Sequence, residues 1–215
     1  MVDDASGNIR QALAQSIVTA LERRCVGSRV ALRGSLATDD TDRYSDIDLC
    51  WVVPDARFDQ AIAQIGETLA TVGPVASLRS DRQFQRSTKR RLVFVRFADV
   101  PLFWRVDLEV FAESVADDPD FDVNNSDAQG DRWSPTDSAL MNALAAIKAV
   151  RRGQPAVAHG LLERGYARVG LTRDLDRGWP DQILGLTSGI AALDPSVAAL
   201  ADQIEELVRK ELGTP

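Results

Sequence analysis

Hydrophobic residues return with helical spacing near the start of the chain. Ile9, Leu13, Ile17 and Leu21 recur every four residues, and this period predicts a helix over residues 8–24. A stripe of this kind buries one side of a helix and leaves the other side to water. The chain therefore opens with a helix that needs a partner to cover its apolar side.

Four later runs contain clustered apolar residues, and each predicts a strand. They cover residues 28–34, 47–53, 91–97 and 103–111. Pro54 ends the second run, because proline cannot donate to a strand ladder. A helix over 56–73, closed by Gly73, follows it. Residues 98–102 join the last two runs as a hairpin or a close strand pair. This order predicts an α/β fold with a mixed sheet and flanking helices.

The pattern changes after an acidic, loop-like stretch over residues 112–133. Ser134 can cap a helix that runs to Gly153, with Pro135 at its first position. Two further helical patterns follow, over residues 155–171 and 195–212. The chain is thus predicted to hold a sheet domain over residues 1–133 and a helical bundle over residues 134–215.

Composition narrows the class of protein. The chain has 215 residues, 45% of them hydrophobic, which is ordinary for a soluble globular protein of one or two domains. The net charge of −7 argues against extended nucleic acid, which needs a basic face. No apolar run is long enough to cross a membrane, and the N-terminus lacks the apolar core of a secretion signal. Cys25 and Cys50 lack metal-type spacing. We expect a cytoplasmic protein, monomeric or homodimeric, that does not bind membranes.

Two carboxylates stand at the start of the second predicted strand. Side chains alternate in a strand, so Asp46 and Asp48 point to one face. Like charges this close need a cation between them. Mg²⁺ prefers oxygen ligands and often shares them with substrate phosphates. The pair therefore predicts a magnesium site.

The same alternation recurs in the last predicted strand, where Asp107 and Glu109 share a face. If that strand lies beside the second one, Asp107 completes a cluster of three carboxylates. Such clusters hold two metal ions about 3.5–4 Å apart. Glu109 remains the alternative third acid, with Asp107 preferred.

Gly34 and Ser35 precede Asp46 by a spacer of ten residues. Glycine at a strand end lets the backbone approach a ligand closely, and the serine offers a hydroxyl and an amide to phosphate oxygens. The combination of a strand, Gly-Ser, the spacer and "DID" before an apolar strand is far more specific than any of its parts.

Together these residues resemble the nucleotidyltransferase superfamily related to DNA polymerase β. The motif stretch is "LRGSLATDDTDRYSDIDL", and the resemblance spans residues 28–111. "YSDIDL" is especially similar to small bacterial members, the aminoglycoside and minimal nucleotidyltransferases. The resemblance implies a nucleotidyltransferase domain over residues 1–133, followed by a helical domain.

The resemblance also implies roles for named residues. Gly34 and Ser35 would hold the β- and γ-phosphates of a nucleoside triphosphate, with ATP preferred over the others. Asp46 and Asp48 would ligate its Mg²⁺. Asp107 would bind a second Mg²⁺ and help to deprotonate the acceptor hydroxyl. The α-phosphoryl group would move to that hydroxyl and release pyrophosphate. The general base is either Asp107 or an acid of the helical half such as Glu163.

The acceptor carries no readable signature. It is either a small molecule such as an aminoglycoside or a partner protein, as in toxin-modifying relatives. A third alternative is a regulatory protein that binds nucleotide without turnover. Lys148 either contacts the triphosphate or stabilises the C-terminal end of its helix through its positive charge. The acidic stretch from Glu113 to Asp131 either attracts a cationic acceptor or is a solvated loop.

Overall fold

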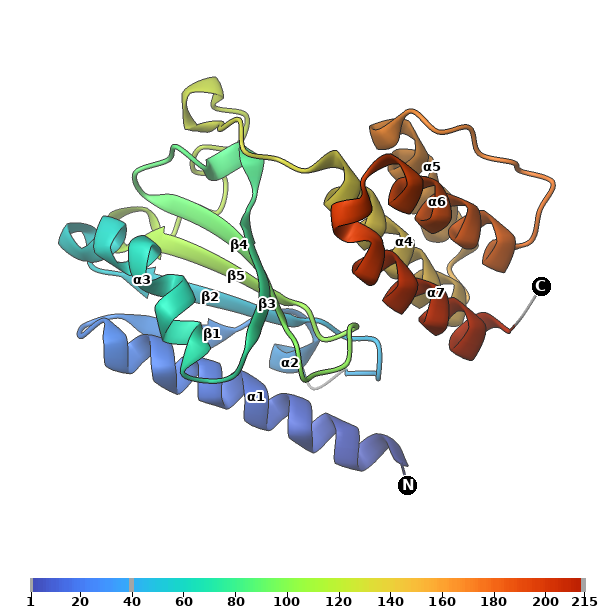
Figure 1. Ribbon diagram of the computed structural model, residues 1–215. Coiled ribbons are helices and arrows are strands. Elements are labelled where there is room, and N and C mark those ends of the chain that lie inside the picture. The colour runs from blue at the N-terminus through green and yellow to red at the C-terminus, as the bar shows by residue number, and fades with distance from the viewer. Residues whose placement is uncertain (1, 39–40, 214–215) are drawn as a thin grey trace. The chain divides into compact units, whose positions relative to one another are not determined.

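The computed structural model describes residues 2–38 and 41–213 and divides into two compact units (Figure 1). The N-terminal unit is Met1–Trp133 and the C-terminal unit is Ser134–Pro215. Within the described residues, none of the helices combines the length and hydrophobicity that crossing a membrane requires.

The N-terminal unit alternates helices with strands. Its helices and strands are α1 (Val2–Arg24), β1 (Arg29–Leu32), α2 (Gly34–Thr38), β2 (Ile47–Val53), α3 (Phe58–Ala70), β3 (Val75–Ser80), β4 (Arg90–Phe97) and β5 (Val106–Ala112). Short 3-10 turns η1 (Asp55–Arg57), η2 (Arg82–Phe84), η3 (Glu113–Val115) and η4 (Ser126–Ala128) join or follow them. The first predicted helix is confirmed, although it begins six residues earlier, and all four predicted strands are confirmed, although the first ends at Leu32 and Gly34 begins α2.

The five strands form one sheet in the order β1-β2-β5-β4-β3. β2 and β5 run parallel, whereas the other neighbouring pairs are antiparallel. The predicted mixed sheet is confirmed. The sequence analysis missed β3, an edge strand in which no residue is fully buried, so its apolar pattern is weak.

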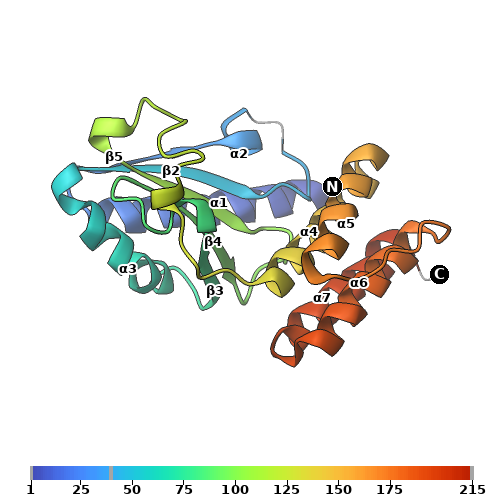
Figure 2. The same cartoon turned by 90° about the horizontal axis from the view of Figure 1, so that it is seen from above.

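The sheet has two different faces. A Cβ built on Gly66 of α3 would lie 3.7 Å from Leu78 Cδ1 on β3, so α3 packs on the face that carries Leu78. The strand register puts buried Val106 on that face too. Asp48 and Asp107 occupy alternate positions and therefore lie on the opposite face. Figure 2 shows α2 and α3 on opposite sides of the sheet. We refer to the side with Asp48 and Asp107 as the carboxylate face.

The C-terminal unit is a bundle of helices. It contains α4 (Pro135–Arg151), α5 (Pro155–Val169), α6 (Trp179–Leu193), the 3-10 turn η5 (Pro195–Val197) and α7 (Ala198–Leu212). The Oγ of Ser134 accepts a hydrogen bond of 3.0 Å from the Asp137 amide, which confirms the predicted cap. The sequence analysis missed α6, whose internal Gly185 and Gly189 lower helix propensity.

Candidate active site

Two predicted site carboxylates meet at the beginning of the parallel strand pair. Asp48 on β2 is the register partner of Asp107 on β5. Directly paired residues point to the same face of a sheet, so the two side chains are neighbours. Asp46 immediately precedes β2, because the strand begins at Ile47. The Ile47 amide donates to the Arg105 carbonyl at 2.9 Å, which extends the pairing one step beyond the strands.

Gly34 lies against this pair. Its φ of +55° is in the left-handed region, and a Cβ built on it would lie 2.2 Å from the Oδ2 of Asp48. The neighbouring Arg33 amide donates to the Asp48 carbonyl at 2.8 Å. The glycine is therefore required both for its backbone conformation and for the space that the Asp48 carboxylate occupies. Ser35 follows it in α2 and is partly buried.

A guanidinium group that the sequence analysis missed binds Asp107. Arg105 donates from Nε to Oδ1 and from Nη2 to Oδ2 of Asp107, each at 2.6 Å. The guanidinium also lies over the Phe94 ring, 5.1 Å from its centroid. The signal was present in "WRVDLEV", because strand alternation puts residue 105 on the same face as residue 107.

The pKa of Arg105 is affected by all three predicted acids. Burial favours its neutral form and acts to lower its pKa. Asp107 opposes this effect through its charge and hydrogen bonds, and Asp46 and Asp48 add to it. The pKa of Arg105 is therefore raised above its ordinary value. Asp46, Asp48 and Asp107 thus act together on one cation.

Glu109 has a different partner. It lies two residues beyond Asp107 and is the register partner of Cys50, not of Asp48. Its Oε1 accepts from Nη2 of Arg90 at 2.8 Å. Arg90 is buried, and its Nη1 also donates to the Pro119 and Phe121 carbonyls at 2.8 and 2.9 Å. The Glu109 carboxylate is therefore part of a contact that fixes the loop after β5.

The acids at the start of β2 and β5 fit part of a magnesium site. Asp48 and Asp107 provide carboxylate oxygens from paired positions, with Asp46 close enough to act on the same guanidinium. Among the described residues, no group of three or more acidic, histidine or cysteine side chains is arranged as a complete metal site. Mg²⁺ typically takes one or two protein carboxylates and completes its shell with water and substrate phosphates. The donor set suits an ion that arrives with a nucleotide.

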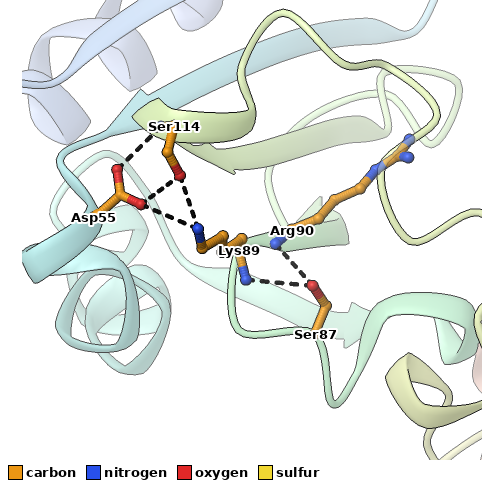
Figure 3. Close-up of polar contacts among 5 residues, drawn as sticks. All are labelled: Asp55, Ser87, Lys89, Arg90 and Ser114. Atoms are coloured by element: carbon orange, nitrogen blue, oxygen red, sulfur yellow. Dashed lines mark hydrogen bonds and ion pairs between the residues drawn. The ribbon is translucent and has the colours of Figure 1, made fainter.

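The opposite end of the strand pair carries a second polar cluster (Figure 3). Asp55, just after β2, accepts hydrogen bonds from the amide and the hydroxyl of Ser114, just after β5. Lys89 Nζ donates to the Ser114 Oγ at 3.0 Å and lies 3.7 Å from Asp55 Oδ1. Nearby, Ser87 Oγ accepts from the amides of Lys89 and Arg90 at 3.3 and 3.0 Å.

Lys148 lies elsewhere in the chain. It is a buried residue of α4 in the C-terminal unit. Its predicted contact with a triphosphate therefore stays a prediction.

Residues 15–114 match the family model described as a nucleotidyltransferase domain. The matched segment contains Gly34, Ser35 and all three predicted acids. This part of the chain belongs to the nucleotidyltransferase superfamily. Among curated proteins, none matches the chain.

Solved structures that match the chain include RNA terminal transferases and an aminoglycoside adenyltransferase. A cytoplasmic RNA terminal U-transferase is 15% identical with a TM-score of 0.39, and 69% of this chain covers 40% of that one. Cid1, an RNA terminal uridylyl transferase, is 17% identical with a TM-score of 0.42, and 77% of this chain covers 42% of that one. An aminoglycoside 6-adenyltransferase from Bacillus subtilis is 11% identical with a TM-score of 0.35, covering 93% of this chain and 96% of that one. The chain spans about two fifths of the length of the first two.

Proposed function

We propose that this protein is a Mg²⁺-dependent nucleotidyltransferase that moves a nucleoside monophosphate, AMP from ATP, onto a hydroxyl of a small molecule. The observation that carries the proposal is the register pair of Asp48 and Asp107, with Gly34 packed against Asp48. The family of residues 15–114 supports the same class of reaction.

The residues have separate tasks in this reaction. Gly34 and Ser35 bind the β- and γ-phosphates where the backbone comes close to Asp48. Asp46 and Asp48 would hold the Mg²⁺ that accompanies the triphosphate, and Asp107 would contribute to a second Mg²⁺ site. Bound there, the ions would supply positive charge against the phosphates.

Asp107 faces the acceptor. It accepts the proton of the acceptor hydroxyl while the hydroxyl oxygen bonds to the α-phosphorus. The bond from the α-phosphorus to its bridging oxygen breaks, and pyrophosphate leaves with the electron pair. Asp107 is proposed over Glu109 for this task, because Asp107 is the register partner of Asp48, whereas Glu109 is the register partner of Cys50. Most of the acceleration in such a reaction comes from positioning and charge neutralisation.

The experiment is pyrophosphate release from each of the four nucleoside triphosphates with a panel of hydroxyl acceptors, run alongside calorimetric nucleotide binding with and without Mg²⁺. We expect Mg²⁺-dependent binding and release that favour ATP. Asp48→Asn should lower release by about 10²–10³-fold, the scale of losing one electrostatic stabiliser of a transition state. Nucleotide binding without release for any acceptor would instead support a regulatory binding protein.

A further inference from the structure

One row of side chains crosses the carboxylate face from the acids to the edge of the sheet. Asp48 pairs with Asp107, Asp107 pairs with Phe94 on β4, and Phe94 pairs with Arg79 on β3. Paired residues share a face, and neighbouring strands are about 4.8 Å apart. Phe94 therefore lies next to Asp107, and Arg79 lies roughly 10 Å from it across two strands.

A second arginine extends the basic end of this row. Arg96 lies two residues beyond Phe94 on β4 and so points to the same face. Its Nε donates to the Oγ of its register partner Ser77 at 3.0 Å. Arg79 is the next residue of β3 on that face, a diagonal neighbour within about 7–8 Å of Arg96. Both arginines are partly buried.

The row extends from Asp107 on the side opposite to the proposed triphosphate site. Gly34 and Ser35 lie on the β2 side of Asp107, where the triphosphate is proposed to bind. A hydroxyl that meets Asp107 from the other side comes past Phe94 and the Arg105 guanidinium that lies over the Phe94 ring. The rest of that acceptor then passes Arg79 and Arg96.

The chemistry of these residues selects an anion. Guanidinium groups bind phosphate with paired, charge-assisted hydrogen bonds. A cationic acceptor would meet like charge there. The acidic stretch that was considered for attracting such an acceptor begins after Ala112, at the far end of β5 from Asp107.

We infer that the acceptor is a small phosphate-bearing molecule, such as a nucleotide, whose phosphate binds Arg79 and Arg96. This inference rests on the proposed function and names the substrate class of the same site. The small size follows from the net charge of −7, which disfavours an extended nucleic acid.

The test is calorimetric binding to the full chain saturated with Mg²⁺ and a non-hydrolysable ATP analogue. The probes are AMP, adenosine, the aminoglycoside kanamycin and a five-nucleotide RNA. We expect AMP to bind at least tenfold more tightly than adenosine, with no binding of kanamycin and no preference for the RNA. The double variant Arg79→Gln/Arg96→Gln should lose that advantage, and Arg79→Lys/Arg96→Lys should keep part of it.

Arg57→Gln is the matched control, because Arg57 is an exposed arginine of the same unit, on η1, outside the carboxylate face. It should leave AMP binding unchanged. The inference is overturned if AMP does not bind, if adenosine or kanamycin binds as tightly, if the RNA is preferred, or if the double glutamine variant binds AMP normally. A separate result would contradict the proposed function itself: binding of the ATP analogue that is unchanged when Mg²⁺ is left out and when Asp48 is replaced by asparagine.

Discussion

Acidic side chains have opposite surroundings at the two ends of the β2–β5 strand pair. At the end where both strands finish, Asp55 is held by the Ser114 amide and hydroxyl, with Lys89 beside it. At the end where both strands begin, Asp46, Asp48 and Asp107 act together on the Arg105 guanidinium. The first arrangement matches one carboxylate with several donors, as a structural contact does. The second concentrates negative charge around one cation, as a site for further cations does.

The same contrast separates the two candidates for the third acid. Asp107 is opposite Asp48, whereas Glu109 points to the buried Arg90 that holds the Pro119 and Phe121 carbonyls. Asp107 and Glu109 are only two residues apart on β5, yet Asp107 lies in the proposed site and Glu109 helps to hold a loop through Arg90.

Replacing Gly34 by alanine should damage the acidic end most. The new Cβ would overlap the Asp48 carboxylate, and alanine is strained at a φ of +55°. We expect a loss of about 1–2 kcal/mol in unfolding free energy from the backbone strain, and a fall of at least tenfold in Mg²⁺-dependent nucleotide affinity. Chemical denaturation and calorimetry measure the two effects.

Gly66→Ala is the control for this change. Its Cβ would meet only Leu78 Cδ1 at 3.7 Å, inside helix α3, where alanine is the better helix former. It should keep nucleotide affinity and slightly raise stability. Equal nucleotide affinity in both alanine variants would contradict the close fit between Gly34 and Asp48.

Removing Arg105 should change the affinity of the acidic end for cations. The guanidinium competes for both oxygens of Asp107, so Arg105→Gln should tighten Mn²⁺ binding in the absence of nucleotide. We expect about a tenfold change, equivalent to ~1.4 kcal/mol. A Mn²⁺ titration followed by electron paramagnetic resonance measures it, with Arg57→Gln as the control. Unchanged or weaker Mn²⁺ binding would show that Arg105 does not compete with cations for Asp107.

The far end should show a smaller effect that depends on pH. Hydrogen bonds from the Ser114 hydroxyl and amide, followed by the charge of Lys89, hold the pKa of Asp55 below its ordinary value. A carboxylate whose pKa is lowered by folding stabilises the folded state at any pH above its unfolded-state pKa of about 3.9. This stabilisation is lost as the pH falls through the folded-state pKa. Asp55→Asn should therefore lower the Tm slightly at pH 7, and the difference should close in acid.

Asp117→Asn is the comparison for that measurement, because Asp117 is an exposed acid of the loop after β5. Its Tm should match that of the parent chain at every pH. A Tm difference for Asp55→Asn that stays constant down to pH 2 would show that the carboxylate charge of Asp55 does not contribute.

The fold was largely readable from residue periodicity, whereas contacts across strands were not. Alternation in "SDIDL" and "RVDLEV" was enough to put Asp46 with Asp48 and Asp107 with Glu109. The register that sets Asp48 opposite Asp107 depends on which strands become neighbours, and local sequence does not encode that choice. For the same reason the row through Phe94 and Arg79 could not be seen before the strand order was known.

The central claim is that Asp107, opposite Asp48, is the third acid of a nucleotidyl transfer site. The most direct measurement compares pyrophosphate release by Asp107→Asn and Glu109→Gln, each checked for folding by thermal unfolding. The account predicts a loss of about 10²–10³-fold for Asp107→Asn, with a lower Tm because Arg105 loses its charged partner but with a cooperative unfolding transition that is kept. For Glu109→Gln it predicts a lower Tm with release within about tenfold of the parent chain. Full activity in Asp107→Asn, or a loss confined to Glu109→Gln, would contradict it.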